Sequence, residues 1–184
     1  DTASIRLNRQ VDNLLNMSRL ESGILKLNID WCDINELIHS VIQKIPNTGS
    51  HSIHFENNEN LPLFKIDAGL IEHVIYNIVH NAILYTPEKS SIEIQAADSK
   101  NKCIITIADN GIGFPEKEIH HVFEKFYRLP DTKTGGSGLG LSIAKGFIDA
   151  HHGTLRLENR KNGGALFTIE LTVETSFLNN LKNE

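Results

Sequence analysis

Two glycine-rich segments and one pair of asparagines carry the chemistry that can be read from this sequence. Asp109 opens the segment Asp109-Asn110-Gly111-Ile112-Gly113. Its carboxylate can accept a hydrogen bond from the exocyclic amine of a nucleobase. Because glycine has no Cβ atom, Gly111 and Gly113 allow the backbone to approach a flat ring closely. The segment therefore indicates a place where a purine base can bind.

The second segment, Gly136-Ser137-Gly138-Leu139-Gly140, comes at the start of an apolar-periodic stretch that predicts a helix over residues 139–150. The first N–H groups of a helix have no partner inside it, so a phosphate can bind there. The segment lacks the lysine of a P-loop and follows no strand directly, which excludes the P-loop and Rossmann motifs. Glycines at a helix start cost conformational entropy, and this favours close backbone approach to a ligand.

Asn77 and Asn81 lie four residues apart in a predicted helix, so their side chains share one face, opposite the apolar stripe. Amide oxygens suit Mg²⁺, which keeps several waters and takes its other ligands from phosphates. Tyr85 continues the same face. Taken alone, the pair is more simply interpreted as two solvated asparagines.

The stretch Phe123-Glu124-Lys125-Phe126-Tyr127-Arg128 puts two aromatic residues where a cover over the site would hinge. Arg128 is a suitable counter-charge for a terminal phosphate. Residues 128–136 are polar and rich in glycine and threonine, which predicts a mobile loop. For Phe123, packing in the core is the simpler interpretation.

The pattern around these residues predicts an α/β two-layer sandwich, with strands on one side and three longer helices on the other. Alternating and apolar runs separated by short polar turns predict antiparallel hairpins. The predicted helices cover residues 1–22, 33–45, 67–85, 116–123 and 139–150, and the predicted strands cover 52–56, 63–66, 91–97, 102–108, 154–158 and 165–172. Asp33 and Asp67 are the predicted N-caps of the second and third helices.

The first helix carries an apolar stripe that needs a partner. Leu7, Val11, Leu14 and Ser18 follow one another at steps of four and three, and Leu15 widens the stripe. We favour a helical bundle that dimerises, because the helix precedes the globular pattern and has no paired helix in the chain. The alternative is a helix that lies on its own domain.

Composition excludes several classes. Eighteen Lys and Arg against 23 Asp and Glu give a net charge of −5, and the basic residues are spread, which argues against nucleic-acid binding. Cys32 and Cys103 have no metal or redox spacing, so we expect free thiols in a reducing cytosol. No apolar run reaches the ~18 residues of a membrane helix. The chain starts inside a helical pattern, and we expect it to be part of a longer protein.

Together the segments resemble the catalytic ATP-binding domain of sensor histidine kinases, in the wider family of type II topoisomerases, MutL and the heat-shock chaperones. The resemblance implies the Bergerat-type ATP-binding fold. It is carried by residues 73–87 (the asparagine box), 109–113, 122–128, 136–141 and 163–168. Residues 1–23 resemble the second helix of the dimerisation and phosphotransfer bundle, 24–174 the ATP-binding domain, and 175–184 are expected to form a flexible tail. The potassium-responsive KdpD-type kinases are the most similar branch.

The resemblance implies roles for the site residues. Asp109 would accept from the adenine amine, and Thr168 would help through a water. Asn81 would bind Mg²⁺ with help from Asn77, and Arg128 would reach the terminal phosphate; Asn81 and Arg128 are the predicted catalytic residues. The other predicted ATP contacts are Tyr85, Gly111, Gly113, Phe126, Gly136, Ser137, Gly138, Leu139 and Gly140.

The resemblance also implies partners. In these kinases a histidine on the first bundle helix, followed by an acidic residue and an arginine, receives the phosphate, and none of the nine histidines here has that context. We expect the phosphoacceptor helix upstream of Asp1, so the chain would bind ATP without phosphorylating itself. The full-length protein would be a homodimer that serves a response regulator. The chain would be the cytosolic part of a bacterial sensor anchored in the membrane through segments upstream.

Two other functions stay open. Self-contained ATPases of the topoisomerase, MutL or chaperone type carry a glutamate four residues before the metal asparagine as a general base, and this chain has Asn77 there. A degenerate nucleotide sensor without phosphotransfer is the second alternative. Its motivation is Leu84, where relatives often carry a lysine, and His80, where an acidic or polar residue is frequent.

Overall fold

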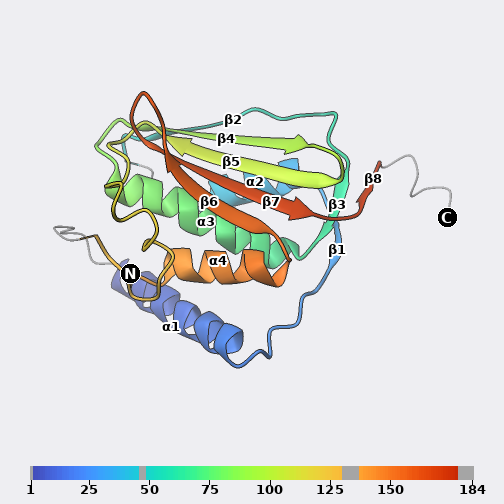
Figure 1. Cartoon of the computed structure of the whole chain (residues 1–184), viewed down its shortest axis with the longest axis horizontal. Coiled ribbons are helices and arrows are strands. Elements are labelled where there is room, and N and C mark those ends of the chain that lie inside the picture. Colours follow the sequence, from blue (N-terminus) through green and yellow to red (C-terminus); the bar gives the residue numbers. More distant parts are fainter. Residues whose placement is uncertain (1, 46–48, 130–136, 178–184) are drawn as a thin grey trace.

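The computed structural model describes residues 2–45, 49–129 and 137–177 of the chain (Figure 1). In chain order the elements are α1 (Thr2–Glu21), β1 (Asp30–Cys32), α2 (Ile34–Lys44), β2 (Ser52–Phe55), β3 (Leu63–Ile66), α3 (Ala68–Tyr85), β4 (Ser91–Asp98), β5 (Lys102–Asp109), α4 (Gly140–Ala150), β6 (Thr154–Asn159), β7 (Ala165–Thr172) and β8 (Thr175–Ser176).

The main sheet has the strand order β2-β4-β5-β7-β6, and a small sheet has the order β1-β3-β8. In the main sheet β2 runs parallel to β4, and every other pair is antiparallel. Figure 1 shows α3 and α4 lying across one face of the main sheet, with α2 behind them. The predicted two-layer α/β sandwich with a mixed, mainly antiparallel sheet is confirmed.

The core lies between the main sheet and the helices. Along β4, buried Ile92 and Ile94 alternate with exposed Glu93 and Gln95, the period-2 pattern of a strand covered on one face. Opposite them, α2, α3 and α4 bury their apolar faces. The largest fully buried side chains are Phe64, Phe147, Ile34, Ile38, Ile66, Ile71, Ile75, Ile78, Ile92, Ile94, Ile105 and Ile107.

Aspartates cap two of these helices, as the sequence predicts. The Asp33 side chain accepts hydrogen bonds from the backbone N–H groups of Asn35 and Glu36 at the start of α2. Asp67 accepts from the Leu70 N–H at the start of α3. Each bond satisfies a donor that the helix itself leaves unpaired, so these caps fix where the two helices begin.

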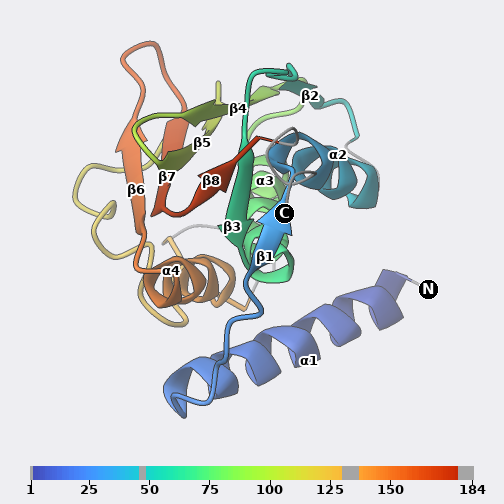
Figure 2. The ribbon, with the colours of Figure 1, turned by 90° about the vertical axis from the view of Figure 1, so that its right-hand side faces the viewer.

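Helix α1 rests on α4 by one face (Figure 2). Leu20 packs against Gly146 so closely that a Cβ atom there would lie 2.7 Å from Leu20 Cδ1. Glu21 forms an ion pair with Lys125 at 2.6 Å. The predicted apolar stripe points elsewhere and stays 47–61% exposed, at Leu7, Val11, Leu14 and Leu15. The helix therefore lies on its own domain, and a partner for the stripe stays a prediction.

Two predicted segments differ from the structure. Residues 116–123 form successive turns instead of a helix, with bonds from Glu118 N to Pro115 O and from His121 N to Glu118 O. Ile119, Val122 and Phe123 have helical spacing and pack on the core, but the segment is only two turns long and its bonds join residues three apart, as in a 3₁₀ turn. The predicted tail begins with an ordered strand, because Thr175 and Ser176 pair with β3.

Both cysteines are buried and free, as predicted. Burial raises the pKa of the Cys32 thiol to about 11 and raises the pKa of Cys103 further. Neither thiol is therefore ionised near neutral pH. Across the described residues, no helix combines the length and the apolar character that crossing a membrane requires.

Candidate functional site

Asp109 ends β5 and is buried, with 7% of its surface exposed. Its Oδ1 atom accepts two backbone hydrogen bonds, from Gly111 N at 2.8 Å and from Ala165 N at 3.2 Å. Among the described residues, Oδ2 has no hydrogen-bond partner, and it is not sealed from solvent. One carboxylate oxygen is thus fixed, and the other is left to accept from a ligand.

The glycines of this turn are required by protein packing. A Cβ atom at Gly111 would lie 2.7 Å from Thr86 Cγ2, and one at Gly113 would lie 2.5 Å from Asn159 Oδ1. A Cβ atom at Gly164 would lie 2.0 Å from the carbonyl oxygen of Asp109. These distances are far below a normal contact, so a larger residue would displace the turn. The sequence argument attributed the first two glycines to a bound ring, and the structure gives each a protein neighbour instead.

Asn77 connects α3 to the start of α4. Its Nδ2 atom donates to the carbonyl oxygen of Gly140 at 3.1 Å, and the residue is 8% exposed. The prediction that Asn77 lies opposite the buried stripe of α3 is wrong, because α4 packs over that face. Asn81 lies one turn further on and is half-buried, and Tyr85 is an exposed residue at the end of the helix.

The start of α4 lacks a side-chain cap. Leu139 occupies the N-cap position with its side chain buried, so it cannot supply an acceptor to the first turn. Ser137 Oγ accepts from the Leu139 N–H at 3.3 Å, before the helix begins. The N–H groups of the first turn, which no side chain of the described residues caps, and the positive end of the helix dipole favour an anion here.

Gly138 lies directly on the aromatic segment that was predicted to hinge. It has φ +70°, and a Cβ atom there would lie 2.7 Å from the carbonyl carbon of Phe126. Phe126 itself has φ +61° and is 65% exposed, and Arg128, two residues later, is exposed as well. The structure thus brings the backbone of Phe126 and Tyr127 against Gly138, two residues before α4. Gly136 lies outside the described residues.

Helix α3 contacts both the start of α4 and the turn that follows Asp109. Near its middle Asn77 contacts Gly140, and just after its end Thr86 contacts Gly111. Nine residues of helix separate these contacts, which is about 14 Å along the axis. An extended nucleoside triphosphate can span that distance. The structure therefore places Asp109 and the start of α4 about one nucleotide length apart along the same helix.

Thr168 does not join this site. In the sheet Thr168 lies opposite Thr106, so the two side chains share one face. Thr106 and Asp109 are three residues apart on β5, so their side chains point to opposite faces of the sheet. The predicted role for Thr168 is therefore wrong: side chains alternate between the two faces of a strand, and Thr168 lies on the face away from the Asp109 side chain. Ala165 is the residue of β7 that reaches Asp109, through its backbone N–H.

Sequence reasoning also missed two residues at the end of β6. Asn159 bonds to the backbone of Phe114, and Arg160 donates to the carbonyl oxygen of Asp109. They follow Asp109 by about 50 residues in the chain, and no local motif marks them. Only the pairing of β6 and β7 brings them to the turn.

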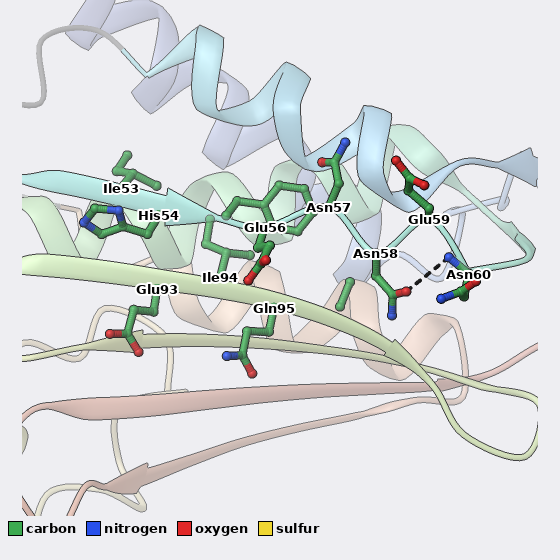
Figure 3. Close-up of a pocket in the computed structure, with 12 residues that line it drawn as sticks. Ile53, His54, Glu56, Asn57, Asn58, Glu59, Asn60, Glu93, Ile94 and Gln95 are labelled. Carbon is green, nitrogen blue, oxygen red and sulfur yellow. Dashed lines mark hydrogen bonds between the residues drawn. The ribbon is translucent and has the colours of Figure 1, made fainter.

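Two hollows lie elsewhere on the molecule. One, of about 980 Å³, opens between β4 and the chain from Ile53 to Asn60, where Glu56 and Asn57 follow the end of β2 (Figure 3). The other, of about 540 Å³, lies next to it beside α2. Neither contains a predicted site residue. Within the described residues, no cluster of three His, Cys, Asp or Glu side chains could hold a metal ion.

Residues 66–175 match the family described as "Histidine kinase-, DNA gyrase B-, and HSP90-like ATPase". The match covers more than half of the chain and contains both Asp109 and the start of α4. The chain belongs to this family. Membership confirms the resemblance to the ATP-binding domain that the two glycine segments and the asparagine box carry.

Sensor kinases of the family resemble this chain over most of its length. It is 34% identical over 169 residues to the sensor protein KdpD of Escherichia coli (strain K12) and 33% identical over 175 residues to the sensor histidine kinase WalK of Bacillus subtilis (strain 168). The matches cover 91% and 90% of this chain, but only 19% and 28% of those proteins. The chain therefore spans less than a third of the length of either relative.

Solved structures of the family share the fold. The catalytic domain of the histidine kinase ThkA, in a nucleotide-free form, is 32% identical with a TM-score of 0.68, and the match covers 79% of this chain and 96% of that one. Full-length ShkA in complex with AMPPNP has a TM-score of 0.81 at 23% identity, and the match covers 93% of this chain and 36% of ShkA. The layers and helices described above are those of a kinase ATP-binding domain.

Proposed function

We propose that this chain binds Mg–ATP and, within a longer protein, donates its γ-phosphate to a histidine, as the catalytic part of a two-component sensor histidine kinase. The observation that carries the proposal is the pair of opposed ends on α3. At one end is the open Oδ2 atom of Asp109, and at the other is the uncapped start of α4.

At the base end, Asp109 acts as a fixed hydrogen-bond acceptor. Backbone N–H groups of Gly111 and Ala165 hold its Oδ1 atom, so that Oδ2 accepts from the exocyclic amine of adenine. Because the carboxylate is already oriented, binding costs little side-chain entropy. An Oδ2 atom that accepts from adenine also selects against a base that presents an acceptor at the same place.

At the phosphate end, the backbone amides at the start of α4 bind the phosphate oxygens. The amide oxygen of Asn81, with help from Asn77, suits Mg²⁺, which would neutralise charge on the phosphates. Asn77 Nδ2 is held by Gly140 O, so its Oδ1 atom has a set direction. Arg128 would contact the terminal phosphate, and Tyr85, Phe126, Ser137 and Gly138 would line the site.

Slow hydrolysis follows from the same residues. Asn77 stands where ATPases of the wider family carry a glutamate, and an amide cannot take a proton from water. The alternative of a self-contained ATPase therefore lacks its general base. Bound ATP would persist until an acceptor histidine comes into line with the γ-phosphate, because phosphoryl transfer depends mainly on positioning.

The partners follow from the relatives, which are named as sensor proteins and histidine kinases. We propose that the acceptor histidine lies on another helix of the same full-length protein, which would be a homodimer through the exposed stripe of α1. A response regulator would take the phosphate onward. In such a protein this chain would lie in the cytosol, with any membrane anchor in other segments.

Calorimetric titration with ATP, in Mg²⁺ and in EDTA, tests the binding step. The expected result is one site per chain with tighter binding in Mg²⁺. Absence of ATP binding would overturn the proposed function.

A second experiment tests transfer, by mixing the chain with an acceptor bundle from the same full-length protein and with radiolabelled ATP. Acid-labile label on the acceptor histidine is expected. ATP binding without any label would favour the degenerate sensor, and rapid steady hydrolysis would favour the ATPase.

A further inference from the structure

Two residues at the end of β6, Asn159 and Arg160, hold the turn that carries Asp109 through hydrogen bonds to its backbone. The side-chain amide of Asn159 bonds to Phe114 in both directions: Oδ1 accepts from Phe114 N at 2.8 Å, and Nδ2 donates to Phe114 O at 2.7 Å. Nδ2 also donates to Glu116 Oε1 at 3.1 Å. One amide thus satisfies both backbone groups of a residue 45 positions away, which fixes that residue in position and orientation.

Close packing and a neighbouring cation complete this grip. Gly113 has φ +73°, and its backbone passes so near Asn159 Oδ1 that a Cβ atom would lie at 2.5 Å. Arg160 Nη1 donates to the carbonyl oxygen of Asp109 at 2.9 Å. The guanidinium also lies 3.8 Å from Glu93 Oε2, which keeps it over the sheet. The turn is therefore held at its first residue by Arg160 and at its last by Asn159.

The orientation of the Asp109 carboxylate depends on that turn. Its Oδ1 atom is bonded to Gly111 N, which belongs to the turn, and to Ala165 N, which belongs to β7. If the turn shifts relative to β7, the two donors separate and the carboxylate rotates. Geometry of this kind must be held to about 0.5 Å for a site to work, and supporting side chains supply that precision.

Base selection is the property most sensitive to such a shift. Adenine presents an amine where guanine presents a carbonyl oxygen. An ionised carboxylate only accepts, so it attracts the first and repels the second. This difference is lost when Oδ2 moves out of hydrogen-bond range, whereas the phosphates bind at the other end of α3 and are indifferent to the shift.

We propose that Asn159 is a positioning residue that sets the preference for adenine over guanine, by clamping the turn from Asp109 to Phe114. The inference rests on the proposed function, since it concerns the base end of the same site. Asn159 acts on the base through Asp109, and it exerts this effect through its two hydrogen bonds to the backbone of Phe114.

Three variants of the whole 184-residue chain test it. N159A removes both bonds to Phe114. N159D keeps an acceptor for the Phe114 N–H but loses the donor. N162A makes the same Asn-to-Ala change at an exposed position of the same hairpin and is the matched control. Dissociation constants are measured for ATP, GTP and inorganic tripolyphosphate.

Wild type and N162A are expected to prefer ATP to GTP. N159A should weaken ATP about tenfold, the equivalent of one good hydrogen bond. Its affinities for GTP and tripolyphosphate should stay within about twofold, so that the ATP/GTP ratio falls about tenfold. N159D should fall between wild type and N159A.

An unchanged ATP/GTP ratio, or an equal loss for all three ligands, would overturn the clamp while leaving ATP binding by wild type, and so the proposed function, intact. No binding of ATP by wild type would overturn both. Amide hydrogen exchange without nucleotide gives an independent readout. The Gly111 amide should exchange faster in N159A than in wild type, while the amides of Ile105 and Ile169 stay protected. If N159A does not fold, the same comparison is made with N159D. Equal protection of the Gly111 amide in variant and wild type would overturn the clamp.

Discussion

At the base end of the candidate site the polar groups of the protein bond to one another, whereas at the phosphate end, within the described part of the chain, no side chain caps the first turn of α4. Asp109, Asn159 and Arg160 take part in bonds to the backbone of the turn or of β7. The start of α4 has no side-chain cap, and Leu139 at that position is apolar. The two ends lie on one helix, α3, but they are built differently.

Under the proposed function, the difference in construction follows from what each end would bind. A neutral base is recognised by a few hydrogen bonds, so selectivity depends on atoms fixed in advance. A triphosphate carries its own charge and binds wherever unpaired N–H groups and a helix dipole converge. Changes at the base end should therefore alter selectivity and local stability, and changes at the phosphate end should alter the response to Mg²⁺.

The largest effect is expected from Gly164→Ala. The residue has φ +91°, and the new Cβ atom would lie 2.0 Å from Asp109 O, so strain and overpacking add. The free energy of unfolding should fall by about 3–5 kcal/mol in urea denaturation. Gly23→Ala is the control, because Gly23 has φ +65° with nothing within 4 Å, and should cost only about 1 kcal/mol. Equal losses of unfolding free energy in the two variants would mean that the backbone around Asp109 moves to accommodate the new Cβ atom at little cost.

Asp109→Asn should have the next largest effect, on affinity. The variant replaces a charged acceptor by an amide, and ATP binding should weaken by about 1–3 kcal/mol, or roughly fivefold to 150-fold. Calorimetry measures this, with Asp98→Asn on an exposed strand end as the control. Unchanged affinity for ATP would remove Asp109 from base recognition.

Asn81→Ala sharpens the contrast at the phosphate end. Loss of one neutral Mg²⁺ ligand should weaken ATP binding in Mg²⁺ by about tenfold, as for one lost hydrogen bond or ligand. Affinity for ATP in EDTA should stay the same, which controls for general damage to the site. The same loss in both buffers would show that Asn81 supports the fold instead of the metal.

The smallest effect concerns pH. His73 on α3 packs edge-on against Phe147 of α4, at 5.6 Å between ring centroids. Burial lowers the pKa of His73 below its usual 6.5, although Asp12 and Glu72 oppose the shift. Between the folded pKa and 6.5 the unfolded chain binds the extra proton, so stability rises with pH through that window and levels off above 6.5.

Urea denaturation at pH 7.5 and at pH 5.5 measures this dependence. Wild type should be less stable at the lower pH, and His73→Gln should lose part of the difference. An identical pH dependence in the variant would assign the effect to other groups. Since His73 lies one turn before Asn77, weaker α3–α4 packing at low pH should affect the phosphate end before the base end.

The order and bounds of the main elements could be predicted from local pattern. Asp33 and Asp67 were identified as caps because a cap is a short-range feature of sequence, and both are confirmed. Asp109 could be picked out because an acidic residue between an apolar strand and glycines is equally local. The prediction of a helix over 116–123 is wrong because a stretch of about eight residues is too short to favour a helix strongly: its apolar side chains reach the core from successive turns instead.

The remaining errors share a cause in tertiary structure. Asn77 is buried because α4 covers it, and nothing near Asn77 in the sequence says so. Thr168 faces away from Asp109 because the register of β5 and β7 fixes the parity of each side chain. Asn159 lies about 45 residues from the backbone that it holds. Contacts between segments far apart in the chain produce no local pattern, so they cannot be predicted from the periodicity of a single sequence.

The small sheet has a consequence for any shortened version of the chain. The family match starts at Ile66, in the last position of β3, whose partner β1 comes from residues 30–32. Ile34, Ile38 and Val41 of α2 are fully buried against the rest of the core. A polypeptide trimmed to residues 66–175 would lose α2 and β1 and would expose hydrocarbon surface, and we expect it to aggregate. The stretch that the family match covers is shorter than the stretch that must fold together.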